Sequence, residues 1–211
     1  GHVRELLARG SDDVSLQEWA DTGVNCVMGV PPAEAHPLGL KTRTWFTMTA
    51  INPDVFDGDL EKIRSMAAVG ADGTLHRPYD PLFPSVARLY TACVNKPAWR
   101  EYAAQRFRTM AEDGWDGCHI DYASHYEQCY CEYCRQAWAE FARERGLAAT
   151  DLIDLPGDFA TRMHLREFRI LNVMDFLGMV RDEARKINPD FGTDGTWHQD
   201  SGSTYQWAYE D

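Results

Sequence analysis

Apolar residues recur along this chain with the period of a helix in some segments and with the composition of a strand in others. Ser15 and Glu18 form a capping-box motif that is expected to open a first helix, and Gly23 is expected to end it. The segments 24–30 and 42–51 then have the composition of strands, with many β-branched and aromatic residues. The chain is therefore expected to begin with a helix and to continue as alternating strands and helices.

Further helices are predicted by apolar stripes and by residues that cap helix ends. Leu60, Ile63 and Ala67 share one face of a helix expected at 60–69, and Gly70 stands where a left-handed cap would end it. Three more helices are expected after Asn95 as far as Gly114, from Cys134 to Gly146, and from Leu165 to Ile187.

The strand-like segments complete the pattern and indicate a fold class. They cover 24–30, 42–51, 88–93, 117–123, 191–198 and 205–209. Alternation of strands with helices is typical of parallel strands joined by crossover helices. Roughly six βα units predict an α/β fold of the TIM (β/α)8-barrel type, with a doubly wound sheet as the alternative.

The length of the chain bears on how complete this barrel is. A full barrel usually needs about 250 residues, whereas the chain has 211 residues, 44% of them hydrophobic. That length and apolar content favour one globular domain over 1–211. Strands seven and eight are not evident, so we expect an incomplete barrel. It is either a fragment or a barrel completed by a further chain segment or by another copy in a homo-oligomer.

Charge and hydropathy exclude some classes of partner. The net charge of −12 and the pI near 5.0 oppose binding to a phosphate backbone, so nucleic acid is not an expected partner. No run reaches the roughly 18–20 apolar residues needed to cross a bilayer, and the start of the chain lacks the pattern of a signal peptide. We therefore expect no membrane partner and a cytoplasmic location, where cysteines stay reduced.

A close group of cysteines is the strongest chemical signal in the sequence. It consists of Cys129, Cys131 and Cys134. Thiols at this spacing are typical of metal sites, and zinc held by four protein ligands is tetrahedral and closed. Segments that follow neighbouring barrel strands emerge on the same rim, so Cys93 is the favoured fourth ligand, with His125 and Cys118 as alternatives. Because four thiolates leave no position for water, we expect a structural zinc.

Carboxylates at the expected strand ends are the candidate catalytic groups. Asp121 ends the fourth expected strand, and His119 shares its face one layer deeper. Glu210 follows the sixth expected strand. Paired carboxylates at a barrel mouth suit cleavage of a glycosidic bond, because one protonates the leaving oxygen while the other attacks or activates water. Two simpler interpretations stay open: Asp121 as a strand-end residue bonded to a loop, and Glu210 as a solvated carboxylate.

Aromatic and imidazole side chains near these strand ends are candidate contacts for a sugar. The expected substrate-binding residues are His119, Tyr122, Trp45, Trp197 and His198. Asp194 marks the fifth expected strand together with the last two of these residues. Most of the seven Trp and nine Tyr are nonetheless expected in the core.

Three segments of the sequence resemble glycoside hydrolase family 42, a family of β-galactosidases. They are 88–102, His119-Ile120-Asp121 and 129–138, and the resemblance covers 88–197. Members of the family are TIM barrels with a structural zinc, bound by a Cys after strand three and a Cys-x-Cys-x-x-Cys run after strand four. The resemblance therefore implies a structural zinc on Cys93, Cys129, Cys131 and Cys134.

The catalytic residues of that family carry over only in part. The family's acid/base glutamate closes an Asp-Asn-Glu run on strand four, where this chain reads Asp121-Tyr122-Ala123. The segment 114–121 also resembles uncharacterised glycoside-hydrolase-like barrels with an Asp at the same strand end, a position similar to the nucleophile of α-amylases. By this resemblance Asp121 is expected as nucleophile or transition-state stabiliser, and Glu210 as acid/base.

The sequence thus predicts a glycoside-hydrolase-like enzyme that cleaves a glycosidic bond in an oligosaccharide or glycoside, with a structural zinc. The alternative is a carbohydrate-binding or scaffolding pseudoenzyme, since Ala123 stands where the family has its acid. A third interpretation makes the metal catalytic. A catalytic metal requires an open ligand position, and four thiolates would leave none.

Overall fold

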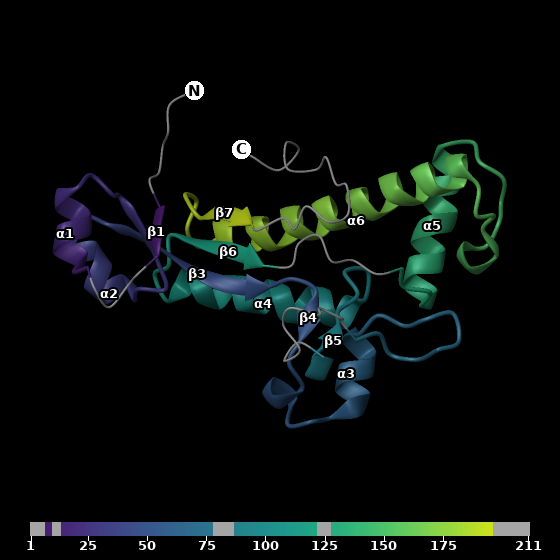
Figure 1. Ribbon diagram of the computed structural model, residues 1–211, viewed down its shortest axis with the longest axis horizontal. Helices are drawn as coiled ribbons and strands as arrows, with labels where there is room; N and C mark the ends of the chain where they lie inside the picture. The colour runs from purple at the N-terminus through teal and green to yellow at the C-terminus, as the bar shows by residue number, and fades with distance from the viewer. Residues whose placement is uncertain (1–6, 10–13, 78–86, 122–127, 196–211) are drawn as a thin grey trace. The chain divides into compact units, whose positions relative to one another are not determined.

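The computed structural model describes residues 7–9, 14–77, 87–121 and 128–195 (Figure 1). Its contacts group the chain into two compact units. Unit 1 comprises Gly1–Phe46, Ala104–Asp121 and Met179–Thr196, and unit 2 comprises Thr47–Ala103, Tyr122–Gly178 and Trp197–Asp211. Both units draw on segments far apart in the sequence, so each of them depends on long-range contacts.

Unit 1 is built on a five-stranded sheet with the strand order β1-β2-β3-β6-β7. The strands are β1 Leu7–Arg9, β2 Cys26–Met28, β3 Lys41–Thr47, β6 Gly117–Asp121 and β7 Gly192–Gly195. β1 with β2, β2 with β3, and β6 with β7 pair in parallel, and the arrows of β3 and β6 point the same way in Figure 1. The prediction of an α/β fold with a parallel sheet is confirmed.

Short helices follow the first two strands of unit 1. α1 Leu16–Asp21 begins after Ser15, whose hydroxyl accepts a hydrogen bond from Glu18 N, while Ser15 N donates to the Glu18 carboxylate at 2.8 Å. The expected capping box is therefore confirmed. α2 Pro32–Ala35 follows β2. These elements share a small apolar core made of Val24, Val27, Ala35 and Leu40.

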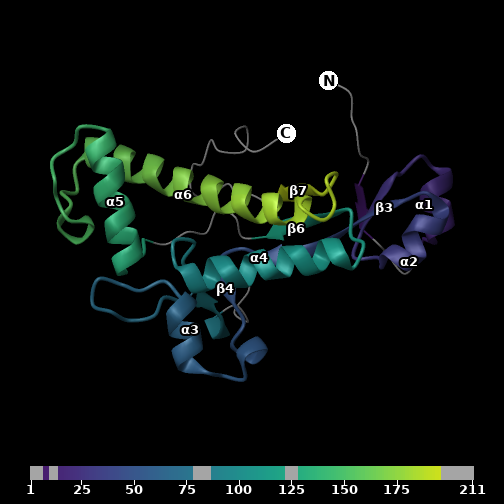
Figure 2. The ribbon, with the colours of Figure 1, turned by 180° about the vertical axis from the view of Figure 1, so that it is seen from behind.

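The sheet of unit 1 has one apolar face and one polar face. Phe46 on β3 packs edge-on against Phe107, with ring centroids 5.3 Å apart, and Phe107 also contacts Phe191. Phe107 belongs to α4 Pro97–Glu112, whose C-terminal half covers this face (Figure 2). Since side chains alternate along a strand, the polar residues of β3 and β6 point to the opposite face.

Unit 2 contains a small antiparallel sheet and the two other long helices. β4 Ala50–Ile51 pairs with β5 Tyr90–Thr91. Between them in sequence lies α3 Leu60–Met66, whose first amides are capped by the carboxylate of Asp59. The later helices are α5 Glu132–Glu144 and α6 Phe159–Arg185.

An aromatic cluster joins α5 to the part of α6 that belongs to unit 2. The ring centroids of Trp138, Phe141 and Phe168 lie between 5.4 and 5.6 Å apart. Arg145, after the end of α5, adds an ion pair to Glu167 at 2.6 Å. These contacts fix α5, and with it the position of the helix start that carries two of the cysteines.

The expected strand 42–51 is wrong as a single element. The chain turns after β3, and β4 pairs in a different sheet. Trp99 Nε1 donates to Met48 O at 3.1 Å, and Ala92 N donates to Thr49 O at 2.9 Å. The turn is thus held by donors from far along the chain, which override the local strand composition.

The expected third parallel strand, 88–93, is also wrong, because β5 is short and antiparallel to β4. The chain has a strand, β1, before its first helix rather than beginning with the helix. The expected helix 60–69 ends at Met66, because Ala67 adopts an extended conformation and bridges to Ala92. Gly70 is not left-handed, so it is not the expected cap of this helix.

The remaining expected elements agree more closely with the structure. The helices expected after Asn95, from Cys134 and from Leu165 correspond to α4, α5 and α6. The strands expected at 117–123 and 191–198 correspond to β6 and β7, whereas the one expected at 205–209 lies outside the described residues. Among the helices of the described segments, none combines the length and apolar character needed to cross a membrane.

Candidate metal centre and carboxylate network

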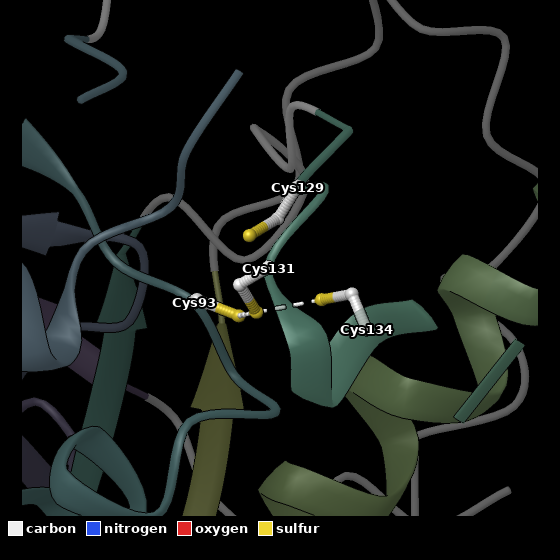
Figure 3. A group of neighbouring side chains, drawn as sticks. All are labelled: Cys93, Cys129, Cys131 and Cys134. Atoms are coloured by element: carbon white, nitrogen blue, oxygen red, sulfur yellow. Dashed lines mark hydrogen bonds between the residues drawn. The ribbon is translucent and has the colours of Figure 1, made fainter. Parts of the chain in front are cut away.

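Four cysteine side chains converge in unit 2 (Figure 3). The Sγ atoms of Cys93, Cys129, Cys131 and Cys134 all lie within 4.8 Å of one another. Cys93 Sγ is 3.8 Å from Cys131 Sγ and 3.4 Å from Cys134 Sγ. All four side chains are buried, and all six cysteines of the chain are free thiols. The structure thus brings together the four thiols that the sequence singles out as one group.

Backbone hydrogen bonds place two segments of this cluster. Cys93 follows β5, and its N–H donates to Met66 O at 2.9 Å. Tyr130, inside the cysteine run, donates from its N–H to Val69 O at 2.9 Å. The backbone between Met66 and Val69 therefore holds both the segment of Cys93 and the segment of the other cysteines.

The start of α5 carries two of the cysteines. Cys131 is the N-cap residue, and Cys134 lies in the first turn, where free N–H groups and the helix dipole favour negative charge. Two donors also point at sulfur: Val69 N at 3.4 Å from Cys129 Sγ, and Asn95 Nδ2 at 3.3 Å from Cys134 Sγ. Because N–H donors stabilise thiolates, the surroundings favour the form of cysteine that binds metals.

The sulfurs also hydrogen-bond to one another. These hydrogen bonds shift the pKa values of Cys93 and Cys131 in opposite directions. Hydrogen bonds from Cys129, Cys134 and Cys93 lower the pKa of Cys131 below the usual range of a thiol. Hydrogen bonds with the other three cysteines, together with burial, raise the pKa of Cys93 well above that range. Of these two thiols, Cys131 is thus the more readily deprotonated, and a bound divalent cation requires deprotonated sulfurs.

The spacing of the sulfurs fits a tetrahedral metal ion. Zinc–sulfur bonds of about 2.3 Å at tetrahedral angles place neighbouring sulfurs about 3.8 Å apart. The separations of 3.8 and 3.4 Å from Cys93 Sγ agree with this value. The cluster is enclosed by apolar side chains, among them Trp138 and Leu152. A buried group of four sulfurs suits an ion that stabilises structure better than one that needs an open position for chemistry.

A second group of polar side chains lies on the polar face of the unit 1 sheet. His119 on β6 is directly opposite Asp194 on β7, and its Nδ1 is 2.6 Å from Asp194 Oδ1. His119 Nε2 is 3.3 Å from Asp121 Oδ1, two residues further along β6. Arg43 on β3 donates from Nη1 to Asp194 Oδ2 at 2.9 Å. This network runs across three strands, from Arg43 to Asp121.

The imidazole of His119 lies between two carboxylates. Hydrogen bonds to Asp121 and Asp194 raise the pKa of His119 from 6.5 to about 9. The side chains of His119 and Arg43 are only 12% and 11% exposed, whereas that of Asp121 is 33% exposed. At neutral pH the imidazole is therefore a nearly buried cation, and the carboxylate of Asp121 reaches solvent.

Some of the other candidate residues lie in the described segments, and the rest lie outside them. Trp45 lies on the same face of β3 as Arg43 and is 39% exposed, and its ring covers Gly29, where a Cβ would stand 2.5 Å from it. Cys118 is buried on the apolar side of β6 and is not one of the four grouped cysteines. The residues outside the described segments are Tyr122, His125, Trp197, His198 and Glu210.

The sequence does not single out Arg43, and it marks Asp194 only as part of a strand. Two glycines are the available signal. A Cβ at Gly192 would stand 2.9 Å from Arg43 Nη2, and one at Gly117 would stand 2.5 Å from Gly192 O. Gly192 thus makes room for the guanidinium and Gly117 for the backbone of β7, but this is visible only once the strand order is known.

Fold and site together define an α/β protein with a parallel sheet, a buried group of four cysteines, and a carboxylate at a strand end. No family model matches the sequence, and no curated protein matches it. Solved structures with a similar fold are glycoside hydrolases.

Three of these structures illustrate the similarity. The GH42 β-galactosidase Gan42B has a TM-score of 0.59 at 11% identity, over 86% of this chain and 32% of its own. The β-galactosidase of the psychrophilic Marinomonas ef1 has a TM-score of 0.57 at 14% identity, over 90% of this chain and 36% of its own. The glycoside hydrolase domain of PelA from Pseudomonas aeruginosa has a TM-score of 0.51 at 13% identity, over 93% and 60%.

At these identities the similarity shows a shared fold. The chain spans about a third of the length of the two β-galactosidases and 60% of that of the PelA domain.

Proposed function

We propose that this chain belongs to a glycoside hydrolase that cleaves a glycosidic bond in an oligosaccharide or glycoside, on an incomplete barrel of the TIM type. The observation that carries the proposal is Asp121, a partly exposed carboxylate at the carboxyl end of β6, in a fold similar to glycoside hydrolases. Barrel enzymes place their catalytic groups at that end of their strands. The strands that would complete the barrel then come from a further segment or another subunit.

Asp121 is the proposed nucleophile or transition-state stabiliser. As the glycosidic C–O bond breaks, the leaving oxygen takes a proton from a second carboxyl group, and the carboxylate of Asp121 bonds to or stabilises the anomeric carbon. Glu210 is the proposed proton donor, and Trp45 offers an exposed ring on the same sheet face for contact with a sugar. Further proposed sugar contacts are Tyr122, Trp197 and His198. His119, expected from the sequence as a sugar contact, has both ring nitrogens against carboxylates and is not proposed as a direct contact.

We also propose that the four cysteines hold one structural zinc ion. Their burial, their spacing and the N–H donors to sulfur support this role. When bound, the ion supplies a tetrahedral cross-link rather than a reactive centre. Cys93 would then be joined covalently, through the metal, to the start of α5.

Replacement of Asp121 tests the proposed activity. Asp121→Asn should lower turnover on a panel of nitrophenyl glycosides and oligosaccharides by about 10²–10⁴-fold, because it removes the ionised carboxylate. Asp175→Asn is the matched control, since Asp175 is an exposed carboxylate of unit 2 that pairs with Arg100. Unchanged turnover in Asp121→Asn would remove Asp121 from the reaction. Sugar binding without any hydrolysis by the natural chain would favour the carbohydrate-binding alternative.

A further inference from the structure

The polar face of the unit 1 sheet carries an unusual set of linked charges. The inward side chains of parallel barrels are mostly branched and apolar. Here β3, β7 and β6 instead contribute Arg43, Asp194 and His119, each bonded to the next. Because two nearly buried cations are costly to desolvate, their pairing with carboxylates must offset that cost. Such an arrangement is expected where a charged side chain has to be held in a fixed position.

We propose that Arg43, Asp194 and His119 form a relay that holds Asp121 as an ionised carboxylate in one orientation. His119 is in this role a positioning residue that acts on a substrate through Asp121. The expected effect of the relay on turnover rests on the proposed function. The expected ionised states of His119 and Asp121 do not depend on it.

The contacts of His119 require its protonated form. A carboxylate can only accept hydrogen bonds, and a neutral imidazole has one N–H group. Both ring nitrogens of His119 face carboxylate oxygens, Nδ1 at 2.6 Å from Asp194 and Nε2 at 3.3 Å from Asp121. Only the imidazolium donates to both, and the raised pKa of His119 agrees with this geometry.

Arg43 balances part of the negative charge of Asp194, so His119 is not the only cation paired with that carboxylate. Two carboxylates around one imidazolium repel each other, and this repulsion works against the ionised form of both. Asp194 uses its second oxygen to accept a hydrogen bond from Arg43, which offsets its charge and leaves the charge of His119 to act on Asp121. The charged groups with a described contact to His119 are Asp121 on its own strand and Asp194 on β7, Arg43 on β3 contacts Asp194, and Cys118 lies on the other side of β6.

Both oxygens of Asp194 are engaged within the relay. Asp194 has one oxygen bonded to His119 and the other to Arg43, which restrains its orientation although the side chain is 38% exposed. Gly192 allows the guanidinium to lie against β7, since a Cβ there would stand 2.9 Å from Arg43 Nη2. Asp121 ends β6 and is 33% exposed.

Nuclear magnetic resonance of the whole chain tests the ionisation directly. With ¹⁵N-labelled histidine, His119→Gln identifies the signals of His119 by their loss. We expect both ring nitrogens to stay protonated through neutral pH, with a titration midpoint near 9. Asp194→Asn should lower the midpoint by about one pH unit or more, because it removes one of the two carboxylates. Asp175→Asn, which removes an exposed carboxylate elsewhere, should leave it unchanged.

A neutral His119 at pH 7 in the natural chain would overturn the proposal. The titration is measured on the natural chain, and His119→Gln serves only to assign its signals. A titration that is the same in Asp194→Asn as in the natural chain would also overturn it.

A pH–rate profile tests the effect on Asp121. With a nitrophenyl glycoside that the natural chain hydrolyses, His119→Gln should move the acidic limb of kcat to higher pH, because it removes the cation beside Asp121. It should also lower kcat by about 10- to 100-fold with little change in KM, because the carboxylate is less well placed. An unchanged profile in His119→Gln, with Asp121→Asn inactive, would refute the relay and leave the proposed function standing. A doubly protonated His119 in a chain that hydrolyses no glycoside would refute the proposed function and leave the relay standing.

Discussion

Removal of the metal should destabilise unit 2 around the start of α5. The perturbation is a strong zinc chelator added to the zinc-loaded chain. A ligand present at a thousand times its dissociation constant stabilises the folded state by about 4.1 kcal/mol. For a chain of this size, each kcal/mol changes Tm by about 2–4 °C. Chelation should therefore lower Tm by about 8–16 °C.

Thermal unfolding followed by tryptophan fluorescence is a suitable assay. Trp138 is 3% exposed and belongs to the same apolar cluster as the four cysteines, so its emission reports on this region. Cys131→Ala removes the ligand at the N-cap of α5 and should give the low Tm with or without chelator. Cys118→Ala is the matched control, since Cys118 is also buried but is not one of the four grouped cysteines.

The control should keep the full response to the chelator. A chelator effect below about 2 °C in the natural chain, or an undiminished effect in Cys131→Ala, would refute the reasoning. The first result would mean that the metal contributes little to stability, and the second that Cys131 is not a ligand.

Two further predictions concern unit 1. Since the pKa of His119 rises from 6.5 to about 9 on folding, its ion pairs stabilise the fold fully below pH 6.5 and are lost as the pH rises through 9. After screening at the partly exposed carboxylates, the loss should be about 1–2 kcal/mol between urea unfolding at pH 6 and at pH 10, and Asp194→Asn should reduce it. Gly29→Ala should destabilise the chain by about 1 kcal/mol more than Gly23→Ala, because both glycines have positive φ but only Gly29 faces the ring of Trp45. Equal costs in the same assay would contradict the packing of Trp45 over Gly29.

The cysteine group shows how a sequence prediction can name residues that converge in the fold although one step of its reasoning is wrong. The spacing of the trio is local, so it is visible in the sequence without any fold. Cys93 is expected beside the trio because a third parallel strand is expected before it. That strand does not exist: β5 is antiparallel to β4, and Cys93 is placed instead by its hydrogen bond to Met66 O. The four thiols nevertheless converge.

The elements that sequence reasoning missed are short or depend on distant partners. β1 has three residues, and β4 and β5 have two each, which is too short for a periodic signal. Arg43 and Asp194 are 151 positions apart, and neither residue type is unusual on a strand surface. In contrast, α5 and α6 have several turns each, so their apolar stripes and end signals identify them from the sequence.

The metal content of the purified chain tests the central claim most directly. Elemental analysis should find about one zinc per chain, the number that one closed site of four thiolates holds. Cys131→Ser should lose that zinc, whereas Cys118→Ser should keep it. A natural chain that holds no zinc after expression in zinc-supplied medium, or a Cys131→Ser chain that keeps its full content, would contradict the assignment of the four cysteines as a zinc centre.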